Sequence, residues 1–315
     1  MSNLKLINMR DVEVEPILWL WYPFIPYGKV TIIQGDPGEG KTTLVLQIIA
    51  RLTKGESIID EDESLPINVI YQTAEDGLAD TIKPRLLAAN ADCSKVLVID
   101  DSDTPLTMRD ARLEQAIIET NAKLVVLDPI QGFLGADVDM HRANEIRPIM
   151  KHISELAEKY KCAIILIGHM NKCSAGKSAY RGLGSIDFQA AARSVLIVGR
   201  IKDEPEIRVV CQTKSSLAPE AKAVAFRLSE KNGFEWVGEY DVTADDLLSG
   251  TAKGTKKQAA MDFLESLLSG GQMSQTEIME LAERKSIAEK TLRNAKEALG
   301  IKSKRENNQW YWSLD

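Results

Sequence analysis

The stretch Gly35-Asp36-Pro37-Gly38-Glu39-Gly40-Lys41-Thr42-Thr43 meets every fixed position of the G-x-x-x-x-G-K-[ST] phosphate loop. Its glycines let the backbone turn tightly, so that backbone N–H groups can reach phosphate oxygens. Lys41 is expected to reach the β- and γ-phosphates, and the Thr42 hydroxyl is the expected Mg²⁺ ligand. All nine residues are therefore candidate nucleotide-binding residues, and a glycine-rich turn that matches by chance is the alternative.

The sequence on either side of this loop fits the context that the motif needs. Residues 29–34 form a short apolar run that predicts a buried strand, and residues 44–50 continue as a predicted helix. A helix N-terminus favours anions because the helix dipole is positive there. The stretch therefore predicts a nucleoside triphosphate site, with ATP and Mg²⁺ as the expected cofactors.

The composition excludes several other classes of protein. The chain has 315 residues, of which 44% are hydrophobic, enough for one large domain and a small one. It has no apolar run of the length that a membrane span needs, and residues 1–10 lack the apolar segment of a signal peptide. We therefore expect a cytoplasmic protein with no membrane partner. The four cysteines lie far apart and the three histidines lack metal-ligand spacing, so neither a disulfide framework nor a zinc site is indicated.

Two carboxylates follow a predicted strand downstream of the loop. Residues 68–72 predict this strand, which leads to Glu75 and Asp76. Because ligands bind at the carboxyl ends of strands in open α/β sheets, Glu75 is a candidate general base that orients water onto the γ-phosphate. Helix capping is the alternative for Glu75, and it is the expected role of Asp76 for a helix that begins near Leu78.

A further apolar run, residues 124–127, ends at Asp128, 87 positions beyond Lys41 (128 − 41). An apolar strand that ends in aspartate downstream of a phosphate loop is typical of a Walker B element, whose carboxylate holds Mg²⁺. Pro129 stands where the hydrolytic glutamate commonly follows in AAA+ proteins. The base is therefore expected on another strand, which favours Glu75.

His169 follows one more apolar run, residues 162–168. A polar residue at such a strand end would suit a sensor of the γ-phosphate, although a single histidine more often has a structural role. The segment 174–184 is small, polar and basic, and flexible basic loops on NTPase cores often contact nucleic acid. A plain connecting segment is the alternative.

Seven segments of the chain come in a characteristic order: Gly35–Thr43, Ala74–Asp76, Leu127–Asp128, His169–Lys172, Arg181–Ser185, Ala192–Arg193 and Thr213–Lys214. In this order they resemble the motifs of the RecA-like ATPases of the RepA-type hexameric replicative helicases, over about residues 15–240. The resemblance implies that Glu75 activates water and that His169 couples the γ-phosphate to DNA-contacting loops. The chain has Gly168 before His169 where many relatives have two histidines.

The same resemblance implies an arginine finger, which reaches into the nucleotide of the neighbouring subunit and stabilises the charge of the transition state. Arg193 is at the matching position, and Arg181 and Lys214 are further candidates. A finger of this kind makes ATP hydrolysis depend on assembly. The family therefore implies a homo-oligomer.

Residues 250–256 have the composition of a linker between an ATPase domain, residues 1–249, and a small domain, residues 257–315. The small domain is predicted to have three helices, the second beginning at the capping box Ser274–Glu277, and then a hairpin around Asn307-Asn308. This order resembles a winged helix, whose third helix, here from about Ala288 to Leu299, is the recognition element.

The charge gives weak support for a nucleic-acid partner. The net charge of the chain is −7, but residues 251–315 carry 11 Lys/Arg against 9 Asp/Glu. The functional hypothesis is contact with duplex DNA through the third helix and the cations Lys302, Lys304 and Arg305. The alternative is a winged helix that contacts another protein.

Together the residues and the resemblance predict an α/β protein with a RecA-like P-loop fold, a mostly parallel sheet flanked by helices, and a C-terminal winged helix. The predicted function is a Mg²⁺-ATP-hydrolysing motor, expected to be a hexamer that binds single-stranded DNA through central loops. As such it would be a replicative helicase of a plasmid, phage or mobile element. The alternative is an ATP-switched DNA-binding regulator or helicase loader without unwinding activity.

Overall fold

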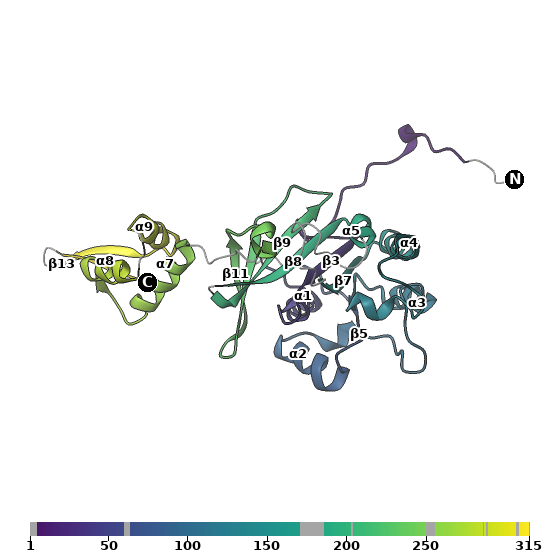
Figure 1. Cartoon of the computed structure of the whole chain (residues 1–315), viewed down its shortest axis with the longest axis horizontal. Helices are drawn as coiled ribbons and strands as arrows, with labels where there is room; N and C mark the ends of the chain where they lie inside the picture. Colours follow the sequence, from purple (N-terminus) through teal and green to yellow (C-terminus); the bar gives the residue numbers. More distant parts are fainter. Residues whose placement is uncertain are drawn as a thin grey trace.

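The computed structural model describes residues 5–59, 64–170, 186–202, 204–249, 256–285, 287, 289–306 and 309–314. Its larger body is built on a nine-stranded sheet in the order β11-β10-β9-β8-β3-β7-β6-β4-β5. Helices cover both faces of this sheet (Figure 1). The predicted α/β class, with a mostly parallel sheet flanked by helices, is confirmed.

Six strands run parallel to one another: β3 (Val30–Gly35), β4 (Val69–Thr73), β5 (Val96–Leu97), β6 (Leu124–Asp128), β7 (Ala163–His169) and β8 (Ser194–Ile201). Except in β5, whose two residues are half-buried, their apolar runs are buried on both faces, as expected for parallel strands between two layers of helices. β5 ends at Leu97. Beyond Leu97 the side chain of Gln72 takes both hydrogen bonds of the Ile99 backbone, so the strand ladder stops there.

The remaining strands are antiparallel. β9 (Glu204–Ser215), β10 (Ala223–Ser229) and β11 (Gly233–Tyr240) extend the sheet beyond β8, and the hairpin of β10 and β11 turns at Gly233, whose φ is 71°. β1 (Trp19–Trp21) and β2 (Ile25–Pro26) form a separate two-stranded sheet.

The helices divide between the two faces because side chains alternate along each strand. Leu124 and Val126 of β6 share a core with α1 (Lys41–Lys54) and α2 (Lys83–Ala88). Val125 and Leu127 point the other way, to α3 (Ala111–Thr120), α4 (Ala143–Tyr160) and α5 (Ile186–Ala191). Short helical segments complete this body: η1 (Met9–Asp11), η2 (Leu78–Ile82), η3 (Cys93–Lys95), η4 (Ile130–Phe133) and α6 (Ala244–Ser249).

The C-terminal part has its own core and its own small sheet. Its elements are α7 (Lys256–Leu268), β12 (Met273–Ser274), α8 (Gln275–Arg284), α9 (Glu289–Ala298), β13 (Lys302–Glu306) and β14 (Gln309–Ser313). The three strands pair in the order β12-β14-β13, and Leu264, Ile278, Leu292 and Trp312 meet in the core. The hydroxyl of Ser274 accepts a hydrogen bond from the Glu277 N–H at 3.3 Å, which confirms this cap.

Some predicted features fall outside the described residues, namely the linker residues 250–255 and the Asn307-Asn308 turn. The three helices and the hairpin strands are present where they were predicted. Among the described helices, none combines the length and the apolar character that a membrane crossing requires.

Candidate nucleotide-binding site

The phosphate loop joins β3 to α1, as the sequence predicts. Gly38 and Gly40 have φ values of 79° and 89°, a conformation that favours glycine. Gly35 is required for a different reason, since a Cβ atom there would lie 2.3 Å from the carbonyl oxygen of Val198 on β8. The loop is therefore a backbone cradle at a helix N-terminus, which suits phosphate.

Lys41 lies across the loop and is only 5% exposed. Its Nζ donates hydrogen bonds to the carbonyl oxygens of Gly35 and Asp36, each at 2.8 Å. Burial lowers the pKa of Lys41, while the nearby carboxylates, Asp128 foremost, oppose that shift. A buried ammonium group among carbonyls is stabilised by a negatively charged ligand, and the γ-phosphate end of ATP provides such charge.

Thr42 and Asp128, the two predicted Mg²⁺ ligands, lie next to each other. The Thr42 hydroxyl donates to Asp128 Oδ2 at 2.7 Å, and burial raises the pKa of Asp128, which is 8% exposed. One hydroxyl and one carboxylate fit Mg²⁺, which usually takes few protein ligands together with phosphate oxygens and water. Among the described residues, no cluster of three or more His, Cys, Asp or Glu side chains offers another metal site.

Tyr71 is a member of this site that sequence reasoning missed. Its side chain is fully buried in β4, and its hydroxyl donates to the same Asp128 Oδ2 at 2.8 Å. Asp128 Oδ2 therefore accepts from two hydroxyls, which fixes the orientation of the carboxylate. The available signal was a tyrosine four positions before Glu75 in an otherwise apolar run.

The strand register brings the predicted catalytic residues to one end of the sheet. Gly35 of β3 is the partner of His169 of β7, and Thr73 of β4 is the partner of Asp128 of β6. Glu75 follows β4 by two residues, and its Oε2 lies 3.8 Å from Nε2 of His169. The phosphate loop, Asp128, Glu75 and His169 thus share the carboxyl edge of four neighbouring strands.

Asp76 does not cap the next helix, so that prediction was wrong. The N-cap position of η2 is Gly77, which makes no side-chain hydrogen bond. The Asp76 carboxylate instead pairs with Arg85 Nη1 at 3.1 Å, one turn beyond the segment it was expected to cap. Glu75 is left as the exposed carboxylate that borders the loop.

Arg193 and Lys214 lie at the opposite end of the sheet. The Arg193 N–H donates to the carbonyl oxygen of Val30, at the start of β3, whereas the phosphate loop follows the end of that strand. Lys214 Nζ donates to the carbonyl oxygens of Gln189 and Ala190 at the end of α5. Burial, and then the charge of Arg193, lower the pKa of Lys214.

Arg181, together with the whole of the basic segment 174–184, lies outside the described residues. One candidate loop residue, Glu39, has contacts that the sequence did not predict. Glu39 lies between two arginines, 3.8 Å from Arg200 Nε on β8 and 3.9 Å from Arg208 Nε on β9. These contacts connect the outer side of the phosphate loop to the antiparallel end of the sheet.

Comparisons with known proteins agree with this geometry. A family model described as an AAA domain matches residues 3–175, more than half of the chain. The chain is 28% identical over 151 residues to the DNA repair protein RadA of Halalkalibacterium halodurans, which is 47% of this chain and 29% of RadA. It is 24% identical over 254 residues to protein RecA of Agrobacterium fabrum, which is 76% of this chain and 67% of RecA.

A solved structure is also similar. The KaiC-like protein of Pyrococcus horikoshii OT3 superposes with a TM-score of 0.51 at 17% identity, over 70% of this chain and 99% of that one. This similarity concerns the fold. The sequence match to RadA spans less than a third of that protein's length, and the match to RecA spans about two thirds of it.

Proposed function

Because the chain belongs to the AAA domain family and has a RecA-like P-loop fold, we propose that it hydrolyses Mg²⁺-ATP in an oligomer that acts on DNA. One observation carries the proposal. The phosphate loop, Asp128, Glu75 and His169 meet at one edge of the sheet, while Arg193 lies at the opposite edge. One subunit then holds most of a hydrolytic site and also offers an arginine to a neighbour.

Each residue of the site has a role that its position supports. The loop backbone and Lys41 bind the phosphates, while Thr42 and Asp128 are the residues that would hold Mg²⁺. Bound Mg²⁺ would supply positive charge that offsets the charge of the β- and γ-phosphates. Glu75 is exposed and takes no part in the Asp76–Arg85 ion pair. Its carboxylate can therefore orient a water molecule and accept a proton from it. His169, 3.8 Å from Glu75, can sense whether the γ-phosphate is present.

Arg193 is the best candidate for the finger that acts in trans. Its N–H is bonded to Val30, which lies five residues before Gly35 on β3, or roughly 16 Å along an extended strand. Arg193 is therefore too far from the loop to serve the site of its own subunit. Its side chain is exposed, whereas the ammonium group of Lys214 is held by two carbonyls of α5. A neighbouring subunit can therefore receive Arg193 more readily than Lys214.

The finer proposal is a hexameric replicative helicase of the RepA type, encoded by a plasmid, phage or other mobile element, with single-stranded DNA held by central loops. The ordered set of motifs supports this assignment. The name of the relative RadA, a DNA repair protein, supports DNA as the partner.

We propose further that residues 257–315 form a winged helix that contacts duplex DNA, with residues 250–256 as the linker. The order helix, strand, two helices and hairpin supports this. The cations of α9 are engaged within the domain, since Arg293 pairs with Glu289 at 2.7 Å and Lys296 Nζ lies 4.6 Å from the ring centre of Trp312. Lys302, Lys304 and Arg305 are exposed on β13, and their positive charge supports the hairpin as a second candidate for DNA contact.

The proposal is tested by measuring ATP turnover with and without single-stranded DNA, beside strand displacement on forked DNA. We expect Mg²⁺-dependent turnover that single strands stimulate, and loss of at least about 100-fold in Glu75→Gln, since a positioned base contributes 10²–10⁴-fold. ATP binding should persist in that variant. Asp76→Asn is the matched control, because it removes only the exposed pair with Arg85.

The outcomes separate the two candidate functions. Displacement of the strand supports the helicase. Stimulated turnover without displacement supports the regulator or loader instead. Turnover in Glu75→Gln equal to that of the unaltered protein would exclude Glu75 as the base.

A further inference from the structure

The hairpin of β13 and β14 carries an exposed tryptophan near its turn. Of the five tryptophans in the chain, all of which the structure describes, Trp310 alone is exposed, with 47% of its surface open to solvent. Trp312, two residues along the same strand, is 2% exposed and lies in the core of the domain. Figure 1 shows this hairpin, in yellow, extending past α8 and α9. Because tryptophan is highly buried on average, an indole ring presented to solvent here calls for a ligand.

The register of the hairpin divides its side chains between two faces. Trp310 is paired with Arg305 across the hairpin. Since alternate residues of a strand share a face, both lie on the face of the buried Trp312, which packs on the helices. Lys302 and Lys304 alternate with Arg305 and therefore lie on the other face. The inner face thus carries one exposed aromatic ring beside one arginine.

Two cations of α9 lie beside this inner face. Lys296 Nζ lies 4.6 Å from the ring centre of Trp312 and donates a hydrogen bond to the hydroxyl of Ser303. Burial, and then the positive charge of Arg293, lower the pKa of Lys296. Like charges therefore gather where α9 meets the hairpin. A negatively charged ligand at this place would relieve their repulsion.

An exposed aromatic ring among cations matches the chemistry of a single nucleic-acid strand. Aromatic side chains stack on nucleobases, and cations contact the backbone phosphates of the same strand. In a duplex each base is stacked between its neighbours, and only the base edges are open in the grooves. The face of the Trp310 ring therefore suits a base that is unpaired.

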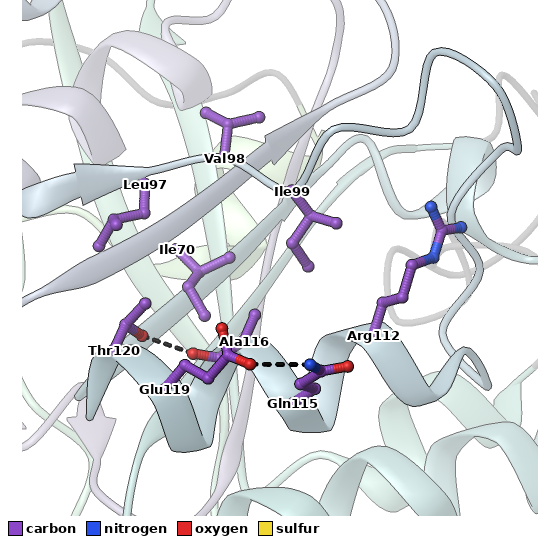
Figure 2. A pocket seen from close by; sticks show the side chains of 9 residues that line it. All are labelled: Ile70, Leu97, Val98, Ile99, Arg112, Gln115, Ala116, Glu119 and Thr120. Carbon is purple, nitrogen blue, oxygen red and sulfur yellow. Dashed lines mark hydrogen bonds between the residues drawn. The ribbon is translucent and has the colours of Figure 1, made fainter.

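The groove of about 290 Å³ between β5 and α3 lacks this combination (Figure 2). Among the described residues that line it, none is aromatic and Arg112 is the single cation. The Arg112 guanidinium already binds the Asp110 carboxylate at 2.7 Å and the carbonyl oxygen of Thr104 at 2.9 Å. The inner face of the hairpin is thus the better candidate for a nucleic-acid strand.

We propose that the inner face of the hairpin, together with α9, binds single-stranded DNA, with an unpaired base stacked on Trp310 and the adjoining phosphates beside Arg305, Lys296 and Arg293. This contact rests on the proposed function, because it needs DNA as the partner. It differs from the duplex contact proposed for the same domain and does not depend on ATP hydrolysis. Duplex contact and strand contact on one domain would place that domain at the junction of a fork.

The first test measures the binding of a fluorescently labelled oligo(dT) to the full-length protein by anisotropy. Trp310→Leu should weaken binding about tenfold, because it removes the stacking of one base. Arg305→Gln should weaken binding severalfold and reduce its dependence on salt. Lys304→Gln is the matched control, since it removes the same charge from the other face, and it should have little effect. ATP turnover without DNA should be unchanged in all three variants.

An oligomer of the same length that lacks bases separates stacking from charge. The unaltered protein and Trp310→Leu should bind this abasic oligomer equally, whereas Arg305→Gln should bind it more weakly. Intrinsic tryptophan emission gives a second readout, because a stacked base quenches the indole. Oligo(dT) should quench the unaltered protein, and most of this quenching should be lost in Trp310→Phe, which keeps an aromatic ring.

The outcomes distinguish this contact from the proposed function. Equal affinity of the unaltered protein and a folded Trp310→Leu for oligo(dT) would overturn the single-strand contact, while ATP turnover stimulated by single strands would leave the proposed function in place. A larger loss on blunt duplex than on oligo(dT) would also overturn it. Thermal unfolding checks that each variant is folded. If Trp310→Leu does not fold, unquenched emission of the unaltered protein with saturating oligo(dT) would be decisive against the contact.

Discussion

Asp128 Oδ2 is the point where three elements meet, because it accepts from Thr42 of α1 and from Tyr71 of β4 while it belongs to β6. A carboxylate held by two hydroxyls has one orientation, which a metal site needs. Burial raises the pKa of Asp128, so the ionised form depends on these donors. Tyr71 is therefore a positioning residue for Asp128, the proposed metal ligand.

Tyr71→Phe should weaken the apparent affinity for Mg²⁺ about tenfold, because a lost hydrogen bond to a charged group costs roughly 1.5–3 kcal/mol. The measurement is a Mg²⁺ titration of nucleotide binding, which does not depend on turnover. Tyr160→Phe is the matched control, since the Tyr160 hydroxyl donates to the Glu114 carboxylate at 2.6 Å, away from the loop. An unchanged Mg²⁺ dependence in Tyr71→Phe would show that Thr42 alone orients Asp128.

At the scale of the element, the phosphate loop depends on its neighbour β8 as well as on its own sequence. Gly35 and Gly38 are both glycines of one motif, but the structure requires them for different reasons. A Cβ atom on Gly35 would meet the backbone of β8, whereas one on Gly38 meets no atom within 4 Å. Gly38 is constrained only by its φ of 79°.

Gly35→Ala should therefore be the more damaging of the two changes. The added Cβ atom would lie 2.3 Å from the Val198 carbonyl oxygen, which can move only if β8 moves. We therefore expect a loss of about 1–3 kcal/mol in stability and a severe loss of nucleotide binding. Gly38→Ala should cost about 1–2 kcal/mol through its backbone conformation. Chemical denaturation and nucleotide titration measure both effects. Equal nucleotide affinities in the two variants would contradict the role of β8.

At the scale of the whole molecule, the two ends of the sheet carry different chemistry. The carboxyl edge holds the phosphate loop, Asp128, Glu75 and His169, and the other edge holds Arg193 and Lys214. If Arg193 acts in trans as proposed, a complete site forms only when copies assemble in a head-to-tail manner.

Mixing two inactive variants tests this division. Lys41→Ala should abolish turnover, and Arg193→Ala should reduce turnover with nucleotide binding nearly intact. In a 1:1 mixture, roughly one quarter of the interfaces combine an intact loop with an intact arginine, so turnover should return in part. Each variant alone at the same total concentration is the control. Turnover of Arg193→Ala at the unaltered level, or no recovery on mixing, would exclude the trans role of Arg193.

The sequence by itself determined the local features: the phosphate loop, the apolar strands, the helix periodicities and the strand-end carboxylates. These follow from residue types at fixed spacing, which act over a few residues. It could not show that Tyr71 reaches Asp128, because the pairing of β4 with β6 joins residues 57 positions apart. It also misassigned Asp76, since the position of Arg85, nine residues further along the chain, decides that contact.

Only the tertiary structure decided which strands are neighbours, and therefore which residues share an edge. His169 and Glu75 are 94 residues apart in the chain (169 − 75), and they come within 3.8 Å because β7, β6 and β4 lie side by side. Arg193 is part of the same ordered set of motifs, but it directly precedes β8. The direction of β8 therefore places it at the end of the sheet opposite the phosphate loop. The physical reason is that sheet order and strand direction are set by the packing of both helical layers, which no single stretch of sequence encodes.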